Sequence, residues 1–190
     1  MTMANPMTVL TETWAVAADP ARIWLLDGRG PWLSGPVMSD DEPHSEVEYS
    51  LSVNHARDHS RGEVALLHST SWRVDGQSVR LTYMAVIDLA GRYAVDLWPH
   101  ARPVSLELAE ACGRPLAHLP TEAPWPRAID VMFHGLKHLR YLADTNDDAA
   151  ATFDLLGHWR AHLDALTPAL AGMYRSVVAE AEAYLTGPGA

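Results

Sequence analysis

Apolar and polar residues alternate strictly in residues 46–53, EVEYSLSV. The apolar members lie on one side of an extended chain, and they are Val47, Tyr49, Leu51 and Val53. This period of two predicts a half-buried strand. Before it, the apolar residues of 14–26 predict one or two short strands, whereas residues 27–36 carry the glycines and prolines of a loop.

Residues 63–73 and 78–89 form two further β-rich runs, and Asp75-Gly76 lies between them. An Asp-Gly pair favours a tight hairpin turn, because glycine tolerates the positive φ that such turns need. We therefore expect an antiparallel hairpin here. Residues 92–98, RYAVDLW, continue the pattern and predict another strand of the same meander.

The period of the apolar residues changes after Pro103. Residues 104–113 predict a short helix, with Ser105 as its N-cap and Gly113 in the position that suits a left-handed residue beyond its end. Residues 114–126 contain four prolines, so they predict an extended linker and no helix.

Apolar residues recur at helical spacing in the last third of the chain. The spacing predicts helices at residues 127–144 and at about 148–166, and at 169–185 either a third helix or a kinked continuation of the second. Thr167-Pro168 supports the start of the third, because threonine caps helices and proline suits the first helical turn.

Together these patterns predict one α+β domain over residues 1–190. Its β half, at about 14–99, is an antiparallel meander of hairpins. This half packs against a C-terminal group of about three helices in residues 127–185. A chain of this length is within the size that one hydrophobic core supports.

The chain has 24 acidic and 14 basic residues and a formal charge of −10. Its arginines are scattered among acids, which excludes the clustered basic face that nucleic acid requires. No apolar run reaches about 18 residues, and the first residues lack the segments of a signal peptide. We therefore expect a cytoplasmic protein without a membrane partner, and the single cysteine, Cys112, agrees with a reducing compartment.

Three histidine pairs have i, i+4 spacing, and one of them is His55 and His59. The other two pairs each follow an aspartate by four residues. The two sets are Asp130, His134 and His138, and Asp154, His158 and His162. On two packed helices they would offer carboxylate and imidazole ligands for Zn, Fe or Mn. The full metalloprotease motif is absent, because Gly135 and Trp159 stand where its glutamate would be.

A plainer interpretation of these histidines remains open. On a helical wheel, one face of the first helix carries Asp130, His134, Lys137 and Tyr141. The opposite face carries the apolar stripe of Met132, Leu136 and Leu139. We expect the polar face to be solvated, in which case its histidines are surface residues.

His68 is a second candidate for function, because alternation places it on the inner face of its strand with Val64, Leu66, Thr70 and Trp72. Arg73 follows on the same strand, and Arg80 and Tyr83 lie across the hairpin. Together, His68, Trp72, Arg73, Arg80 and Tyr83 predict a pocket for an anionic or hydroxylated ligand where the sheet meets the helices. The alternative is a hydrogen-bonded core histidine beside an exposed strand face.

Residues 63–174 contain four segments that together resemble a family of hypothetical proteins from high-GC bacteria. The segments are ALLHSTSWRVDG, RLTYMAVIDL, DVMFHGLKHLRYLADT and HWRAHL. The resemblance implies a compact family fold. It brings no activity, no catalytic residue and no substrate.

The sequence carries no nucleophile elbow, phosphate-binding loop, dinucleotide glycine pattern or paired-cysteine motif. The leading hypothesis is therefore a non-enzymatic accessory module, without a cofactor, that binds a small ligand or a protein. The alternative is a metal-dependent hydrolase that uses the histidines and aspartates with Zn, Fe or Mn. A third hypothesis is a structural protein that forms homo-oligomers.

Overall fold

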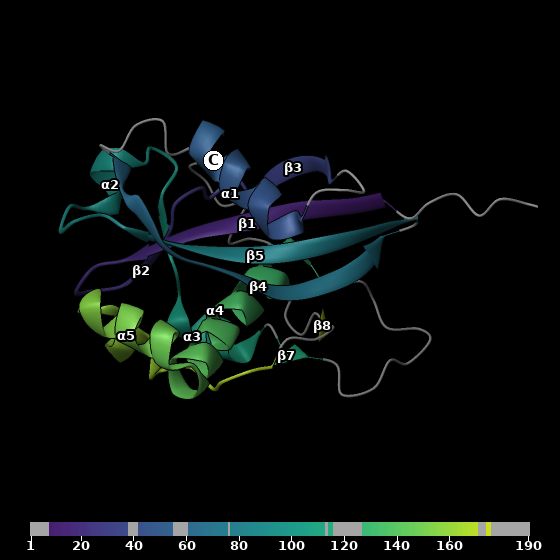
Figure 1. Cartoon of the computed structure of the whole chain (residues 1–190). Coiled ribbons are helices and arrows are strands. Elements are labelled where there is room, and N and C mark those ends of the chain that lie inside the picture. Colours follow the sequence, from purple (N-terminus) through teal and green to yellow (C-terminus); the bar gives the residue numbers. More distant parts are fainter. Residues whose placement is uncertain are drawn as a thin grey trace, which may run out of the picture.

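The computed structural model describes residues 8–37, 42–54, 61–75, 77–112, 114–115, 127–170 and 174–175. The chain is α+β, as the sequence predicts: a six-stranded, mostly antiparallel sheet comes first, and C-terminal helices pack on it (Figure 1). Two earlier helices contact the opposite face of the sheet. The sheet is therefore covered on both sides.

The centre of the sheet is a parallel pair of strands. β1 (Thr8–Ala18) runs beside β5 (Ser78–Asp88) in one continuous register. β4 (Glu63–Asp75) pairs antiparallel with β5 and ends the sheet on that side. This β4–β5 hairpin confirms the prediction from Asp75-Gly76, although Gly76 itself lies outside the described residues. The parallel pair departs from the all-antiparallel meander that we expected.

The other side of β1 is shared by two strands. β3 (Trp32–Val37) pairs with its first part, and β2 (Ile23–Leu25) pairs with its last residues and with β6 (Arg102–Pro103). A separate small sheet joins β7 (Arg114–Pro115) to β8 (Tyr174–Arg175). The remainder of the predicted proline-rich linker, residues 116–126, lies outside the described residues.

β3 occupies residues that the sequence predicted as a loop. Its side chains are half-buried or exposed, and Leu33 is 64% exposed. Backbone pairing with β1, rather than burial, therefore holds this strand in the sheet. Glycine and proline are tolerated because β3 is short and, among the described strands, pairs with β1 alone.

After the sheet, the described residues form the helices α3 (Leu106–Ala111), α4 (Ala128–Thr145), α5 (Asp147–Leu155) and α6 (Trp159–Leu163). α3 confirms the predicted N-cap, because the Ser105 Oγ atom accepts a hydrogen bond from the Leu108 backbone at 3.2 Å. α4 confirms the predicted helix within one residue at each end. In the described part of the chain, no helix has the length and apolar character needed to cross a membrane.

The helix predicted at about 148–166 is in fact two helices. Gly157 has φ of 67° and separates α5 from α6, because the left-handed conformation ends a helix. The prediction at 169–185 is also wrong at its start, since Ala169 and Leu170 are not helical and β8 is a strand. The rest of that segment lies outside the described residues.

The strand predicted at residues 46–53 is instead part of a helix, α1 (Pro43–Asn54). Val47 and Leu51 are buried, but Tyr49, which alternation placed beside them, is 64% exposed. Residues four apart share a face in both a strand and a helix, so a short alternating run fits either structure. Burial against the sheet at this spacing favours the helix.

Residues 92–98 were predicted as a strand and contain a helix, α2 (Ala94–Leu97). Ala90 and Gly91 both have positive φ, 50° and 76°, and turn the chain out of the sheet after β5. Ala94 and Trp98 are then buried at a spacing of four. The strand prediction for residues 92–98 is therefore wrong for the same reason as at α1, because residues four apart share a face in a strand and in a helix.

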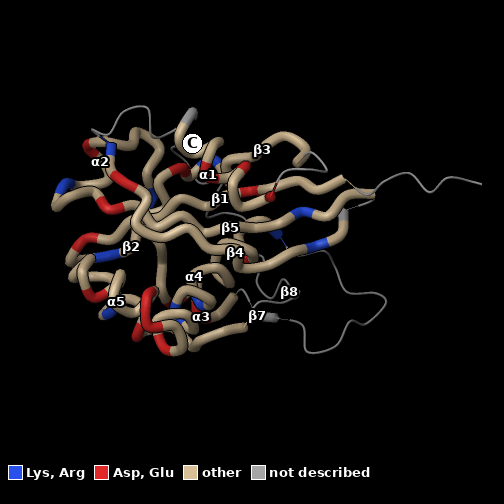
Figure 2. Tube along the Cα trace, viewed as in Figure 1, with Lys and Arg blue, Asp and Glu red and all other residues tan. Residues whose placement is uncertain are grey.

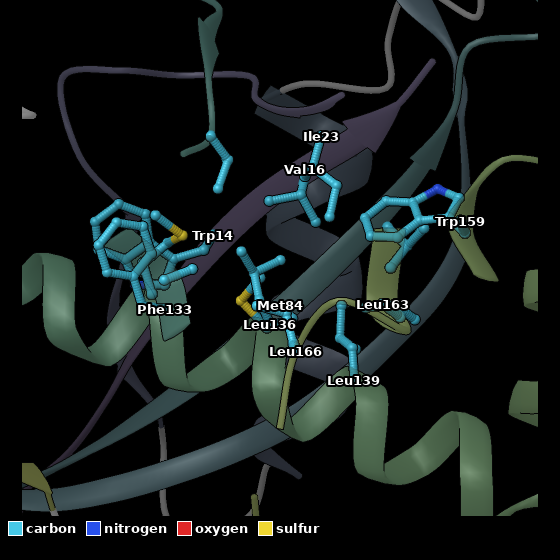
Figure 3. Close-up of a cluster of buried hydrophobic side chains, with 14 of the residues drawn as sticks. Trp14, Val16, Ile23, Met84, Phe133, Leu136, Leu139, Trp159, Leu163 and Leu166 are labelled. Atoms are coloured by element: carbon cyan, nitrogen blue, oxygen red, sulfur yellow. The ribbon is translucent and has the colours of Figure 1, made fainter. Parts of the chain in front are cut away.

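The main hydrophobic cluster fills the space between the sheet and α4 (Figure 3). β1 and β5 contribute Trp14, Val16, Met84 and Val86, and the helices contribute Phe133, Leu136, Leu139, Trp159 and Leu163. A second cluster lies between the other face of the sheet and helices α1 and α2. Both faces of the central strands are therefore core faces.

The polar face of α4 is buried, which corrects the expectation that it is solvated. Asp130 and His134 are fully buried, and Lys137 is 3% exposed. The Lys137 ammonium donates a hydrogen bond to the Glu110 carbonyl at 2.8 Å. The Lys137 backbone carbonyl accepts a hydrogen bond from the Ala169 N–H group at 3.1 Å. The covering segments are α3 and the chain after α6, which a helical wheel cannot reveal.

Candidate functional site

Arg73 and Arg80, two of the five residues predicted to bind a ligand, lie opposite each other on β4 and β5. Arg73 donates to both carboxylate oxygens of Glu12 on β1, at 2.5 and 2.6 Å, and the Arg80 Nε atom lies 4.0 Å from that carboxylate. The Thr82 hydroxyl donates to it at 2.7 Å. The Glu12 side chain is only 3% exposed, so the arginines rather than water balance its charge.

The other three residues of that predicted pocket lie elsewhere. Tyr83 is on the opposite face of the sheet from the two arginines, and its ring centroid is 5.9 Å from that of His44. Burial raises the pKa of the Tyr83 phenol. Trp72 is 50% exposed, and His68 faces α4. The structure therefore brings together Arg73 and Arg80, but not the set of five.

Two β-bulges explain why these residues separate. They interrupt the pairing of β4 with β5 between Val64 and Leu66 and between Ser69 and Ser71. Each bulge adds one residue and so reverses the side on which the following side chains lie. His68 consequently faces α4, whereas Trp72 faces the other way. Strict alternation along β4 predicts the wrong neighbours.

Three histidines form what we call the imidazole row, namely His68 of β4 with His134 and His138 of α4. The ring centroid of His138 lies 5.4 Å from that of His68 and 6.2 Å from that of His134. The rings are nearly parallel, at 23° and 16°. Tyr141 extends the stack, with its ring centroid 5.7 Å from His138. Polar groups thus meet where the β half joins the helical half.

Burial favours the neutral form of two members of the imidazole row, His68 and His138. Burial lowers the pKa of His68, and the nearby His138 and His44 lower it further. Burial also lowers the pKa of His138, against the opposing effect of its hydrogen bond to the Ala169 carbonyl. The His138 Nδ1 atom donates that bond at 3.0 Å. Charging this stack would place positive charges next to one another in the interior.

We expect the free energy of unfolding to fall as the pH drops below about 6.5, the ordinary histidine pKa. The unfolded chain binds more protons than the folded chain in this range, because the folded pKa values of His68 and His138 are lowered. Each histidine contributes at most about 1.4 kcal/mol per pH unit. Urea unfolding at several pH values between about 7.5 and 5 measures the slope.

The variant His138→Gln should have a flatter pH dependence than the wild type. The matched variant His100→Gln, at an exposed loop position, should keep the wild-type slope. An unchanged slope in His138→Gln would contradict the assignment.

The residues predicted as metal ligands do not all meet. His162 donates a hydrogen bond from Nε2 to the Asp19 carbonyl at 2.8 Å, whereas Asp130 is buried in an ion pair. His158 and Asp154 are exposed. All six predicted ligands are among the described residues. Nowhere in the described residues is a group of three or more His, Cys, Asp or Glu side chains arranged to hold a metal ion. The metal-dependent alternative therefore gains no support here.

The described chain has a cleft that the sequence did not predict, and we call it the strand-end cleft. Its volume is about 380 Å³. One wall is formed by residues 18–20 and 87–93, which include and follow the C-terminal ends of the parallel strands β1 and β5. The turn between α5 and α6, residues 155–159, forms the other wall. The volume is within the range of small-molecule sites.

Two aspartates lie in the strand-end cleft. Burial alone raises the pKa of Asp19, but hydrogen bonds from the Trp24 indole and from the Ala21 and Arg22 backbones hold it below its ordinary value. The indole bond is 2.6 Å long. Asp88 accepts from the Ala90 backbone through Oδ1 at 2.7 Å, and no bond to its Oδ2 atom is found within the described chain. Asp19 is thus kept ionised, and Asp88 has a carboxylate oxygen available.

The rest of the strand-end cleft is mixed in character. Ile87, Leu89 and Leu156 give it apolar walls, and Tyr93 and Leu155 stand at its rim with 61% and 88% of their surfaces exposed. Acidic residues also lie on the two helices next to the cleft (Figure 2). These helices are α2, which begins after Tyr93, and α5, which ends at the α5–α6 turn. The cleft can therefore attract a cation and contact an apolar group.

No family model and no curated protein matches this sequence. The resemblance to a family of hypothetical proteins consequently remains an expectation. What can be said of function rests on the geometry of the chain itself.

A weak signal for the strand-end cleft is present in the sequence. Asp19 and Asp88 each follow an apolar run and precede turn residues, in Asp19-Pro20 and before Ala90-Gly91. Aspartates at such positions normally cap turns, as both do here. Only the parallel pairing of β1 with β5 shows that the two carboxylates share a cleft.

Proposed function

We propose that this chain is a non-enzymatic binding module for a small organic molecule that carries an amino group. The observation behind the proposal is the strand-end cleft, where Asp19 and Asp88 lie among apolar residues at the ends of two adjacent parallel strands. A carboxylate that accepts a hydrogen bond from an ammonium group forms a charge-assisted contact, which is stronger than a neutral one.

Three features support an amine over an anion. Asp19 is kept ionised by its hydrogen bonds, and Asp88 offers Oδ2 as an acceptor. The formal charge of −10 favours the approach of cations. Arg92 also lines the cleft and donates from Nε to the Leu89 carbonyl at 2.9 Å, so part of its donor capacity is already used. The apolar walls suit a ligand with a hydrocarbon part.

The proposal predicts selective binding within a matched panel of small molecules. The panel pairs primary amines that carry apolar groups of five to eight carbons with the corresponding carboxylic acids and neutral amides, and calorimetry measures each affinity. We expect the amines alone to bind. Asp88→Asn should weaken their binding by about 10-fold or more, because a charge-assisted hydrogen bond contributes about 1.5–3 kcal/mol.

Asparagine at position 88 can still accept the hydrogen bond of Ala90, so the turn should be kept. Asp96→Asn is the matched control, since Asp96 is exposed on the neighbouring helix α2 and does not line the cleft. Its affinity for the amines should equal that of the wild type. Equal binding of acids and amines, or no binding by any member of the panel, would refute the proposal.

A further inference from the structure

β4 forms one edge of the sheet that the described residues build. It is a strand of 13 residues at the end of the strand order, and within the described residues no strand pairs with its outer side. The backbone groups on that side are directed away from β5 and offer donors and acceptors to an additional strand. Such an edge is the structural requirement for β-strand addition.

A groove runs beside the first part of this edge, and we call it the α1–β4 groove. It has a volume of about 440 Å³. One wall is α1, through His44, Glu48 and Leu51, and the other is β4, through residues 64–67. An edge strand faced by a helix can accept the backbone of a peptide on one side and its side chains on the other.

The bulges of β4 limit what the edge can accept. They divide the strand, so that its regular pairing with β5 runs from Leu66 to Ser69 between them. A long partner strand, such as β4 of a second copy, would meet both irregularities, and bulges are a common protection against this kind of self-association. A short segment of about four to six residues fits beside the regular stretch from Leu66 to Ser69, which overlaps the α1–β4 groove at Leu66 and Leu67.

The chemistry of the groove selects among short segments. The β4 residues of the groove, 64–67, are all apolar, and Leu67 packs on the cluster beneath α1, whereas Leu66 packs on the opposite cluster. On the α1 side, Leu67 favours apolar side chains at alternate positions of the added strand. Glu48 is 62% exposed and lies 3.4 Å from His44, and Glu63 is exposed where β4 begins. These two glutamates, in a chain with a formal charge of −10, favour a basic residue in the partner.

We propose that the α1–β4 groove binds a short extended peptide segment, with alternating apolar residues and at least one lysine or arginine, as an additional strand of the sheet. The peptide would lie antiparallel or parallel to β4, take backbone hydrogen bonds from its outer side, and place its basic residue near Glu48. This site shares no lining residue with the strand-end cleft, so it does not depend on the function proposed above.

The test uses the full chain and a phage-displayed library of random octapeptides. We expect enriched sequences with apolar residues at alternate positions and an excess of lysine and arginine. Synthetic versions of these peptides should bind in fluorescence polarisation. N-methylation of alternate backbone amides, which removes hydrogen-bond donors but keeps every side chain, should weaken binding at least about 10-fold. If N-methylation weakens peptide binding, the peptide binds as an added strand through its backbone, and not through its side chains alone.

Glu48→Lys should weaken binding of the basic peptides by about 10-fold, and Glu46→Lys on the same helix, outside the groove, should leave it unchanged. Enrichment of no sequence, or insensitivity to both N-methylation and Glu48→Lys, would overturn the proposal. So would dimerisation of the wild type through β4, seen by light scattering and abolished by Leu66→Lys, because a second copy would then occupy the edge. None of these outcomes bears on amine binding in the strand-end cleft.

Discussion

Replacing Arg73 by methionine is expected to lower the free energy of unfolding by about 3 kcal/mol. The Glu12 carboxylate is 3% exposed and receives two short hydrogen bonds from this guanidinium group. Without Arg73, the Glu12 carboxylate keeps its hydrogen bond from the Thr82 hydroxyl and the Arg80 guanidinium at 4.0 Å. These two groups compensate the carboxylate charge less well. Urea unfolding followed by tryptophan fluorescence measures the loss.

The double variant Glu12→Met, Arg73→Met separates the ion pair from the packing of its side chains. Apolar residues of similar volume often replace a buried ion pair at little cost, so the double variant should recover most of the lost stability. Arg29→Met is the matched control, because Arg29 makes a similar two-point contact with Asp27 but is 64% exposed. Its effect should stay below about 1 kcal/mol. A double variant as unstable as Arg73→Met would contradict this account.

The second large effect is expected at Gly135, where α4 crosses β5. A Cβ atom built at this position would overlap the Met84 sulfur, and Met84 is fully buried. Gly135→Leu should therefore lower the free energy of unfolding by about 3 kcal/mol, or leave the chain unfolded, because helix and sheet must move apart. Thermal and urea unfolding measure the change.

Met84→Ala should partly rescue Gly135→Leu, since it removes the side chain that the leucine would meet. This double variant keeps the prediction testable if Gly135→Leu alone does not fold. Gly35→Leu is the control, because no atom lies within 4 Å of a Cβ built at Gly35. A rescue that fails, with Gly35→Leu unchanged, would show that the leucine disturbs something other than the Met84 contact.

The sequence predicts the fold best where a local signal is unambiguous. Three local signals each specify one structure and are confirmed. They are the β4–β5 hairpin expected from Asp75-Gly76, the Ser105 cap and the long apolar spacing of α4. The runs at α1 and α2 are short, and a spacing of four buries the same residues in a helix or a strand. The choice there is made by contact with the sheet, which is not local.

The candidate sites are harder to predict because they depend on pairings between distant residues. The bulges of β4 decide which side His68 and Trp72 face, and they leave no clear trace in composition. Asp19 and Asp88 line one cleft because β1 and β5 are parallel neighbours. The i, i+4 histidine spacing correctly places His134 beside His138, but the partner that completes the stack is His68.

The position of β1 also has a consequence for the order in which the chain folds. Glu12 and Thr82 are bound to each other across 70 residues of sequence. The β4–β5 hairpin is local and forms on a scale of about microseconds, whereas closing so long a loop is slow. During synthesis β1 leaves the ribosome long before β5, with both of its apolar faces uncovered. We therefore expect insertion of β1 to be the late step of folding, and chains that have not completed it to be those that aggregate.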